Sequence, residues 1–479
     1  MIIESGLMTD SSNLNIAVIG GGPGGYAAAF LAADLGMKVT LIDREQNPGG
    51  VCLYRGCIPS KALLHVAKVI DESRHATNWG IEFAEPKIDV ARLRSFKEGV
   101  VNKLTGGLGQ VAKMRKVQYV RGEASFENSN TIRVKNNGAE QKLSFDRIII
   151  ATGSRPAVIP SLKLDSPRML DSTSALDIAD VPKTLLVIGG GYIGLELGTV
   201  YAALGSKVSV VEMTPGLLPG ADRDLVLPLH KRLEKIFDSI LLSTTVTAVK
   251  EESNGIRVCF DGKDVKEREK VFDKVLVSVG RKPNSEISDL DRTQVRVGER
   301  GFIQANHHLQ TDDPAIYAIG DVIGEPMLAH KASHEGRTAV EHIAGHKVAF
   351  EPNAIPAVVF TDPEIAWTGL TETQAQKENR EIKVAKFPWA ASGRAVTLDR
   401  TEGMTKLVID PTTERVLGVG IVGPGAGELI AEGTLAIEMA ALAKDIALTI
   451  HPHPTLSETV MQSAEVFFGT STDMYRPKR

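Results

Sequence analysis

Two cysteines with redox potential lie close together near the start of the sequence. Cys52 and Cys57 fall in the segment GGVCLYRGCIPSKALL, which leads into a predicted helix. A disulfide that closes so short a loop restrains the unfolded chain little, so thiol–disulfide exchange explains the pair better than structural stabilisation. A helix N-terminus and the nearby Lys61 predict a lowered thiol pKa. The alternatives are half of a zinc site, for which no second Cys/His pair has suitable spacing, and two unrelated core cysteines. Cys259 stands alone in an alternating strand pattern and is expected to fill the core.

A candidate acid/base pair lies near the other end, in TIHPHPTLSETV. A dithiol must lose a proton before it attacks a disulfide, and an imidazole held by a carboxylate is suited to that step near neutral pH. His453 and Glu458 are the candidates for this pair. Taken alone, His451 and His453 among prolines are more typical of a surface loop, and a metal site is a further alternative because H-x-H places two imidazoles on one side of a strand.

A repeated pattern supplies the elements that must position these groups. Residues 16–43 and 185–212 align without a gap, and each copy predicts a strand, a GxGxxG turn, a helix and a second strand that ends in an acid, Asp43 or Glu212. The glycines allow a tight turn and close approach of a pyrophosphate, and the acid accepts hydrogen bonds from a ribose. One such motif is weak evidence, but two in register predict two dinucleotide sites. No Arg or Lys closely follows Glu212, which favours NAD over NADP at the second site.

Composition narrows the class of protein. The 479 residues carry 55 Lys and Arg against 59 Asp and Glu, so the net charge of −4 provides no global field for nucleic acid or an anionic membrane. Three cysteines are too few for a secreted disulfide framework, and we expect a cytoplasmic protein. No apolar run is long enough for a membrane helix, and residues 1–13 lack the pattern of a secretory signal and are expected to form a tail.

With these motifs in place, the sequence resembles the flavoprotein family of pyridine nucleotide-disulfide oxidoreductases, from about Asn15 to the C-terminal region. The matching segments are GGGPGG, GGVCLYRGCIPSKALL, ATGSRP, GGGYIGLELG, VGRKPN, YAIGDV, MLAHKA, FPWAASGRA and HPHPTLSE. The redox motif C-L-x-x-G-C-I-P-S-K is similar to that of the dihydrolipoamide dehydrogenases within the family and differs from that of the glutathione reductases. Residues 260–479 also lack the additional cysteine pair of mercuric reductases.

The resemblance implies an activity and a role for individual residues. The activity is oxidation of protein-bound dihydrolipoyl groups with reduction of NAD+, through one non-covalent FAD per subunit. Cys52 would meet the lipoyl substrate and Cys57 would lie against the flavin, while His453, held by Glu458, would act as acid/base from the partner subunit of a homodimer. The implied FAD residues are Gly20, Gly22, Gly25, Asp43, Lys61, Ala124, Gly153, Asp321 and Ala329. The implied NAD residues are Gly189, Gly191, Gly194, Glu196, Glu212, Val246, Gly280 and Arg281.

Several finer expectations follow from the same resemblance. Lys61 is expected to pair with Glu196 beside the flavin; the alternative for Glu196 is a solvated helix face. No metal is expected. The implied partners are the lipoyl domains and the subunit-binding domain of a 2-oxoacid dehydrogenase acyltransferase. Alternative functions are an NADH-dependent reductase of another small disulfide and a mainly structural subunit of a complex. The sequence departs from the commonest family pattern at Tyr54-Arg55, where Asn-Val is usual, at Asp43, where Glu is more usual, and at Pro452.

The predicted fold class is α/β, with two Rossmann-like dinucleotide-binding domains for FAD and NAD, a central domain and a C-terminal α+β dimerisation domain. Apolar segments that end in glycine, in RIIIATGSRP, VLVSVGRKPN and IYAIGDV, predict further strands against a cofactor. The predicted boundaries are a tail at 1–13, an FAD-binding domain at 14–155, an NAD-binding domain at 156–281, a central domain at 282–352 that completes the FAD site, and an interface domain at 353–479.

Overall fold

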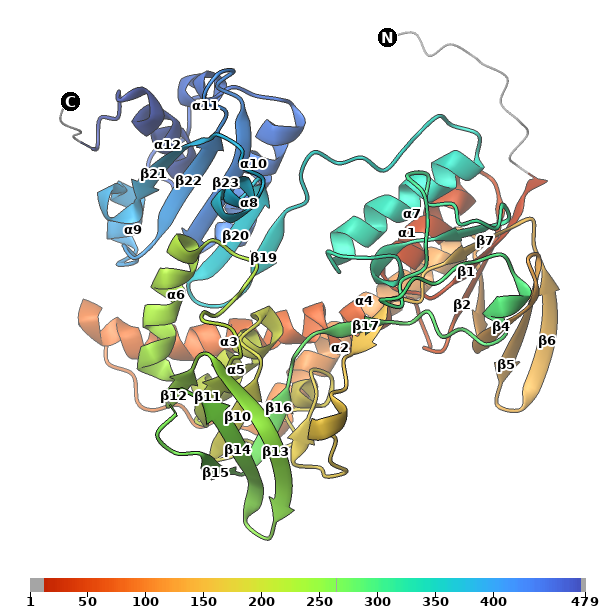
Figure 1. Ribbon diagram of the computed structural model, residues 1–479, viewed down its shortest axis with the longest axis horizontal. Coiled ribbons are helices and arrows are strands. Elements are labelled where there is room, and N and C mark those ends of the chain that lie inside the picture. The colour runs from red at the N-terminus through yellow and green to blue at the C-terminus, as the bar shows by residue number, and fades with distance from the viewer. Residues whose placement is uncertain (1–12, 264, 475–479) are drawn as a thin grey trace. The chain divides into compact units, whose positions relative to one another are not determined.

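The two βαβ repeats build two separate parallel sheets. A computed structural model describes residues 13–263 and 265–474, so almost all of the predicted tail at 1–13 lies outside the described residues. The chain divides into two units (Figure 1). Unit 1 contains Met1–Ala62, Asp89–Ala157 and Gly280–Glu351, and unit 2 contains Leu63–Ile88, Val158–Val279 and Pro352–Arg479. The segment predicted as a central domain therefore clusters with the N-terminal segments.

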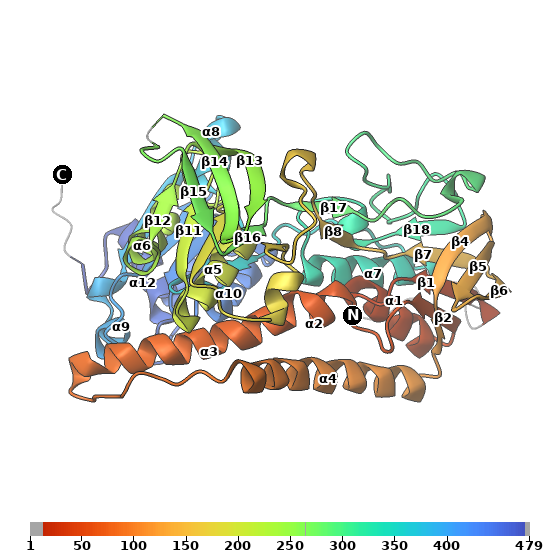
Figure 2. The same ribbon diagram turned by 90° about the horizontal axis from the view of Figure 1, so that it is seen from below.

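Unit 1 is organised around a five-stranded parallel sheet in the order β18-β7-β1-β2-β3. Its apolar strands are buried, which is why they appear in the sequence as nearly continuous apolar runs. The strands are β1 (Asn15–Ile19), β2 (Lys38–Asp43), β3 (Gln118–Arg121), β7 (Arg147–Ile150) and β18 (Ile316–Ala318). Helix α7 (Ala329–Ile343) packs side by side with α1 (Pro23–Asp34) on this sheet (Figure 2).

Unit 1 also contains further helices and two groups of antiparallel strands. They are α2 (Gly50–Arg55), the first turns of α3 (Cys57–His75), α4 (Val90–Met114), the antiparallel strands β4 (Glu123–Asn128), β5 (Thr131–Asn136) and β6 (Ala139–Ser144), and the short pair β8 (Ser154–Pro156) and β17 (Arg281–Pro283). Asp89 caps α4 by accepting a hydrogen bond from the Arg92 N–H at 3.0 Å.

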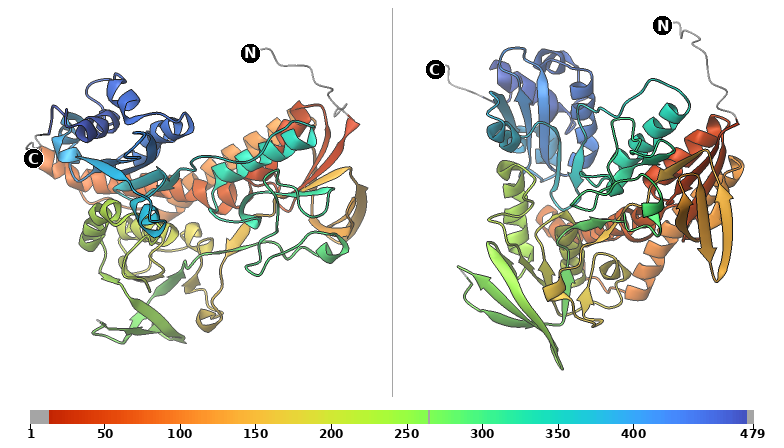
Figure 3. Two further views of the ribbon diagram at one scale, coloured as in Figure 1. Left: turned by 45° about the horizontal axis from the view of Figure 1, so that its top comes forward. Right: turned by 45° about the vertical axis from the view of Figure 1, so that its right-hand side comes forward.

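The first sheet of unit 2 has the order β12-β11-β10-β16-β9, and four of its strands repeat the order found in unit 1. The fifth differs, because β9 precedes the other strands in the chain whereas β18 follows those of its sheet. Its elements are β9 (Met169–Leu170), β10 (Thr184–Ile188), α5 (Tyr192–Leu204), β11 (Lys207–Val211), α6 (Arg223–Ile236), β12 (Ser239–Leu241) and β16 (Lys274–Val277). Between β12 and β16 the chain forms an antiparallel ribbon of β13 (Thr244–Glu252), β14 (Gly255–Gly262) and β15 (Glu269–Phe272), as β4–β6 do in unit 1 (Figure 3). The duplication therefore extends beyond the residues that align in the sequence.

The C-terminal part of unit 2 forms a separate antiparallel sheet in the order β19-β20-β23-β22-β21, which appears in blue in Figure 1. Its strands are β19 (Ala357–Val359), β20 (Glu364–Gly369), β21 (Lys383–Pro388), β22 (Met404–Ile409) and β23 (Val416–Gly423). Its helices are α8 (Glu372–Lys377), α9 (Gly393–Thr397), α10 (Ala426–Glu438), α11 (Ala443–Leu448) and α12 (Glu458–Phe468). This mixture of strands and helices confirms the α+β class predicted for the C-terminal part of the chain.

Candidate active site

The two cysteines of the redox motif lie on consecutive helices of unit 1. Cys52 belongs to α2 and is half-buried, whereas Cys57 is the first residue of α3 and is exposed; the structure holds both in the reduced form, without a disulfide between them. A hydrogen bond with Cys57 and burial raise the pKa of the Cys52 thiol, and the nearby Lys61 ammonium opposes this effect without overcoming it. The expected lowering of the thiol pKa is therefore wrong for Cys52 while the pair is reduced.

Helix α2 begins directly against the first glycine-rich turn. The Gly49 N–H donates to the Gly21 carbonyl at 2.7 Å, and a Cβ added to Gly50, at φ +56°, would lie 2.4 Å from the Gly22 Cα. Tyr26 of α1 interacts electrostatically with both thiols. Burial raises the pKa of its phenol, and Cys52 and Cys57 raise it further. The thiols and the first dinucleotide-type turn therefore form one site, in which Tyr26 is a participant that sequence analysis missed.

The first turn is held closed by the acid at the end of β2. Asp43 Oδ2 accepts the Gly21 N–H at 2.5 Å, and its Oδ1 accepts the Glu45 N–H at 2.8 Å. Gly20 has φ +106°, and an added Cβ would lie 2.3 Å from the Ala151 carbonyl oxygen. Gly22 is the N-cap of α1 and no side chain caps that helix, so its first N–H groups are not occupied by a side chain.

The second turn repeats this arrangement in unit 2. Glu212 Oε2 accepts the Gly190 N–H at 2.7 Å, and its Oε1 accepts the Thr214 N–H at 2.8 Å. Gly191 is the N-cap of α5, again with no side-chain cap and with no heavy atom in front of an added Cβ. A Cβ on Gly194 would lie 2.4 Å from the Gly189 carbonyl oxygen, so this position requires glycine for helix–strand packing.

The surroundings of Glu212 agree with the predicted preference for NAD. The next residue, Met213, is exposed and carries no charge. Arg223 donates to the carbonyls of Leu217 and Ala221, and to a third from Leu218, so these backbone acceptors already engage its guanidinium. Neither Met213 nor Arg223 therefore offers a cation that would pair with the 2′-phosphate of NADP.

Asp321 lies in a polar cluster of unit 1. Its Oδ2 accepts the Ser154 hydroxyl at 2.5 Å, and the Ser154 oxygen accepts from Arg281 Nε at 2.7 Å. Sequence analysis assigned Asp321 to FAD and Arg281 to NAD, whereas here both contact one serine. Ser154 was not predicted, although it lies within the ATGSRP motif.

A buried ion pair supports the turn before Asp321. Glu335 Oε2 accepts the Gly320 N–H at 2.7 Å, and its Oε1 lies 2.7 Å from Lys331 Nζ. Burial raises the pKa of the Glu335 carboxyl, and Lys331 and the Gly320 N–H oppose that shift. Both residues follow Ala329, the first residue of α7, and sequence analysis missed their role.

The remaining predicted cofactor residues fall on several elements. Ala124 is buried in β4, Val246 lies in β13, and Gly153 and Gly280 adopt φ values of +69° and +125° at the ends of buried strands. Glu196 is buried on α5 and its Oε1 accepts the Phe360 N–H at 3.0 Å, so the solvated-face alternative is wrong. The pairing of Glu196 with Lys61 of α3 joins residues of the two units and stays a prediction.

The predicted contact between His453 and Glu458 is present in unit 2. His453 Nδ1 lies 2.9 Å from Glu458 Oε1, and Glu458 Oε2 accepts the Thr455 N–H at 2.7 Å. The His453 side chain is 77% exposed, while that of Glu458 is only 13% exposed. The carboxylate is thus fixed and orients an imidazole whose Nε2 can face a substrate.

His451 is engaged elsewhere. Its Nε2 lies 2.7 Å from Glu432 Oε1 and its Nδ1 lies 2.9 Å from the Thr449 carbonyl oxygen. Each histidine therefore faces its own carboxylate, which argues against the H-x-H metal site. The third cysteine, Cys259, is half-buried and alternates with the buried Val258 and Phe260 on β14, so the expectation that it fills the core is wrong.

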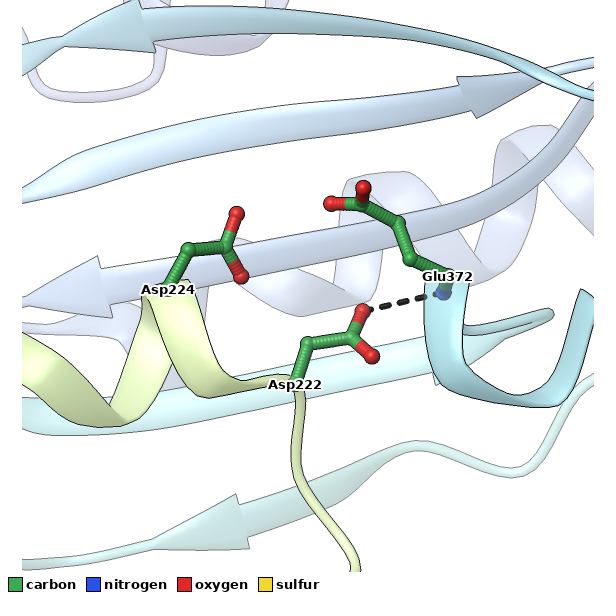
Figure 4. Close-up of side chains that lie close together, drawn as sticks. All are labelled: Asp222, Asp224 and Glu372. Carbon is green, nitrogen blue, oxygen red and sulfur yellow. Dashed lines mark hydrogen bonds between the residues drawn. The ribbon is translucent and has the colours of Figure 1, made fainter. Parts of the chain in front are cut away.

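The described residues contain one group of acids arranged as cation ligands: Asp222, Asp224 and Glu372 (Figure 4). A lysine already occupies the place of a cation there. Lys406 Nζ lies 2.7 Å from Asp222 Oδ2, 2.8 Å from Asp224 Oδ1 and 2.7 Å from Glu372 Oε1. We interpret the group as a structural ion cluster that joins α6 to the C-terminal sheet.

A thiol pair seated against one dinucleotide turn, in a chain that carries a second such turn, defines a class of nucleotide-dependent disulfide oxidoreductases. Residues 14–336 match the family described as pyridine nucleotide-disulphide oxidoreductase, and residues 355–464 match its dimerisation domain. The chain belongs to the pyridine nucleotide-disulphide oxidoreductase family.

Characterised relatives are similar along the whole chain. A dihydrolipoyl dehydrogenase from Haemophilus influenzae is 51% identical, with 98% of each chain covered, and one from Vibrio cholerae is 50% identical, with 98% of this chain and 99% of the relative covered. Among solved structures, LpdA from Mycobacterium tuberculosis has a TM-score of 0.87 at 26% identity, covering 94% of this chain and 99% of its own. The HOCl-induced flavoprotein disulfide reductase RclA from Escherichia coli has a TM-score of 0.82 at 28% identity, covering 93% and 98%. Within the described parts of the chain, no helix combines the length and apolarity needed to span a bilayer.

Proposed function

We propose that the chain is a dihydrolipoyl dehydrogenase, which oxidises dihydrolipoyl groups to the cyclic disulfide and reduces NAD+ to NADH. The observation that carries the proposal is the thiol pair of Cys52 and Cys57 on two consecutive helices, the first of which starts at the first glycine-rich turn. The turn has the features of a dinucleotide site, so a redox cofactor bound there would be able to exchange electrons with the dithiol. The sequence identity of 50–51% to dihydrolipoyl dehydrogenases, over 98% of the chain, supports the choice of substrate.

The residues present fit FAD at the first turn and NAD at the second. Both turns lead into helices of twelve or more residues with no side-chain cap and no acid in the first turn, which suits a pyrophosphate. We assign 14–155 and 282–352 to the FAD site and 156–281 to NAD. Asp43 and Glu212 would accept ribose hydroxyls, and Asp321 would bind along the flavin side chain. When bound, FAD accepts the electron pair of the reduced dithiol and supplies hydride to NAD+.

The chain's own residues carry the thiol chemistry. The cycle begins with Cys52 and Cys57 joined as a disulfide. His453 Nε2 takes the proton of one substrate thiol, and the resulting thiolate attacks the Cys52 Sγ, which breaks the disulfide and releases the Cys57 thiolate. The second substrate thiol then attacks the substrate sulfur of the mixed disulfide. This step forms the substrate disulfide, releases Cys52 and leaves both enzyme cysteines reduced.

We infer that the chain acts as a homodimer in which His453 of one copy serves Cys52 of the other. The match of 355–464 to a dimerisation domain supports this arrangement. Large apolar side chains between the start of α10 and His453 are exposed in the single chain; they are Leu435, Met439, Leu442, Leu448 and Ile450. Exposed apolar surface of this kind is typical of an interface between subunits.

The proposed partners are proteins that carry lipoyl groups. Dihydrolipoyl groups are presented on lipoyl domains, so we propose that the homodimer docks on the subunit-binding domain of a 2-oxoacid dehydrogenase acyltransferase. A cytoplasmic location fits the small number of cysteines in the chain, which is too low for a secreted disulfide framework.

An anaerobic titration tests the proposal. The holoprotein is reduced with dihydrolipoamide while absorbance is recorded, and NAD+ is then added. We expect dihydrolipoamide to produce a long-wavelength thiolate-to-flavin band and then stoichiometric NADH in the unsubstituted chain and in the matched control Cys259→Ser, whereas Cys52→Ser should support no NADH formation. Reduction by NADPH without reduction by dihydrolipoamide would overturn both the substrate and the nucleotide, and would favour a reductase of another disulfide.

A further inference from the structure

Tyr54 and Arg55 lie between the two redox cysteines, at positions where the sequence departs from the commonest family pattern. The Tyr54 hydroxyl donates to the Asn47 carbonyl at 3.1 Å and accepts the Asn47 N–H at 3.2 Å. Arg55 forms an ion pair with Glu45, and its guanidinium lies 6.0 Å from the centre of the Tyr54 ring. Both side chains therefore bind the segment at 44–49.

The segment at 44–49 is the direct continuation of Asp43. Its N-terminal end is fixed by Asp43, which accepts the Glu45 N–H, and its C-terminal end by the Gly49 N–H, which donates to Gly21. The Tyr119 hydroxyl of β3 donates to the Glu45 carbonyl at 3.2 Å. Helix α4 packs against the middle of the segment, since a Cβ on Gly109 would lie 2.2 Å from Asn47 Oδ1. Tyr54 and Arg55 supply the contacts from α2.

We propose that Tyr54 and Arg55 are positioning residues for the nucleotide end of the FAD site: they hold the segment at 44–49, and with it the ribose-binding Asp43, against the helix that carries Cys52. The inference rests on the proposed function, because it takes the first glycine-rich turn as the FAD site. The residues between the redox cysteines would then determine both the position of the Cys52 thiol and the binding of the adenosine ribose.

Charge supports the same assignment. Burial raises the pKa of Asp43, while the N–H groups of Gly21 and Arg44, the guanidinium of Arg55 and, to a smaller extent, the guanidinium of Arg44 lower it. The titratable and charged groups that face this acid from the neighbouring elements are Arg44, Glu45, Tyr54, Arg55, Tyr119, Arg121 and Glu123. Removal of Arg55 takes away a cation that favours the carboxylate form, so protonation of Asp43 would then occur at higher pH.

Two substitutions test the proposal in the holoprotein, with FAD binding as the measurement. Tyr54→Phe removes the hydroxyl and keeps the ring, and we expect it to raise the dissociation constant of FAD about fivefold. Arg55→Val is expected to raise it about threefold at pH 7 and to move the acid limb of FAD binding to higher pH, and Arg55→Lys should restore much of both. A merely structural role for Arg55 does not predict the change in pH dependence.

Arg44→Val is the matched control. Arg44 also neighbours Asp43, but its ion pair with Glu123 has side chains 74% and 62% exposed, compared with 39% and 29% in the pair of Arg55 and Glu45. We expect it to leave FAD affinity within about twofold, as for other exposed ion pairs. Unchanged FAD affinity and pH dependence in Tyr54→Phe and Arg55→Val overturns the inference, as does an equal effect of Arg44→Val.

The inference and the proposed function fail in different ways. If the unsubstituted chain binds FAD and oxidises dihydrolipoamide while the variants hold FAD normally, only the positioning role is wrong. If the unsubstituted chain binds FAD but does not oxidise dihydrolipoamide, the substrate is wrong and the variants still decide the positioning role. If it binds no FAD, both are wrong.

Discussion

Lys406→Met should strongly destabilise unit 2. The Lys406 side chain is 2% exposed, and its ammonium is in contact with three carboxylates. Burial opposes ionisation of Asp222, but hydrogen bonds from Lys406 and Thr373 prevail and lower the pKa of Asp222 from 3.8 to about 2. At roughly 1.4 kcal/mol per pKa unit, this difference corresponds to about 2 kcal/mol of stability from Asp222 alone. Because the variant also leaves Asp224 and Glu372 with less compensation, we expect a total loss of about 3–5 kcal/mol.

Lys386→Met is the matched control for this experiment. Lys386 Nζ contacts two of the same carboxylates, Asp224 at 2.6 Å and Glu372 at 3.0 Å, but its side chain is 38% exposed. We therefore expect a loss of only about 1 kcal/mol. Thermal unfolding followed by circular dichroism should separate the two variants: a loss of 3–5 kcal/mol lowers the midpoint by roughly 10 °C in a domain of 150–250 residues.

The pH dependence has a defined sign. Because the folded-state pKa of Asp222 is depressed, its contribution is present above pH 3.8 and is lost as the pH falls toward 2. The difference in unfolding free energy between the unsubstituted chain and Lys406→Met should therefore be about 1 kcal/mol smaller at pH 3 than at pH 5. Equal losses in Lys406→Met and Lys386→Met would refute the reasoning. So would an increase in the unfolding midpoint of the unsubstituted chain with Mn²⁺ or Ca²⁺, because the ammonium should exclude those ions from the cluster.

Three further predictions concern the site itself. His453→Gln should lower kcat for dihydrolipoamide by roughly 10²–10⁴-fold while the protein retains its FAD, as measured by steady-state kinetics and flavin absorbance; near-normal turnover would show that another group is the base. Met213→Arg should lower the preference for NAD+ over NADP+ at least about tenfold in kcat/KM, since it places a cation beside the ribose-binding acid; an unchanged ratio would mean that the ribose binds elsewhere. Glu335→Gln should cost about 3 kcal/mol in urea unfolding because it leaves the buried Lys331 without its counter-ion, whereas Lys331→Met combined with Glu335→Gln should cost less than Glu335→Gln alone.

Sequence analysis could predict the parts of the site whose partners are close in the chain. Each glycine-rich turn, its helix and its terminal acid lie within one βαβ unit, so spacing alone indicates their geometry. The contact between His453 and Glu458 spans five residues and forms at the start of α12. Strands β7 and β16, each followed by a glycine, were also predictable, because strands buried on both faces give continuous apolar runs.

Contacts between distant residues could not be predicted in this way. Ser154 and Asp321 are 167 residues apart and Asp222 and Lys406 are 184 apart, so neither pair leaves a local pattern. In the sequence, these polar and charged residues also look like ordinary surface residues. Lys406 does carry one signal, since it interrupts the apolar strand MTKLVI and therefore requires a buried counter-ion.

The two errors concerning cysteine have different physical origins. Cys259 stands in GIRVCF, where the period of two places it on the same face as Arg257 and opposite Ile256, Val258 and Phe260, so alternation already contained the correct answer. The pKa of Cys52 depends on burial and on a hydrogen bond to Cys57, and both are properties of three-dimensional packing that spacing does not reveal.

The acid at the end of each βαβ unit has a structural task before any nucleotide binds. In both units, one carboxylate oxygen accepts the N–H of the glycine that follows the first motif glycine, Gly21 or Gly190. The other oxygen accepts an N–H two residues beyond the acid. A shorter Asp43 and a longer Glu212 reach the same donors, at 2.5 Å and 2.7 Å from the glycine nitrogen. Each oxygen retains a second lone pair for a ribose hydroxyl, so the acid that binds the nucleotide is held in place by the turn that binds its phosphates. Because this contact is the same at both sites, it belongs to the geometry of the βαβ unit, and differences in cofactor choice must come from side chains around it, such as Met213 and Arg55.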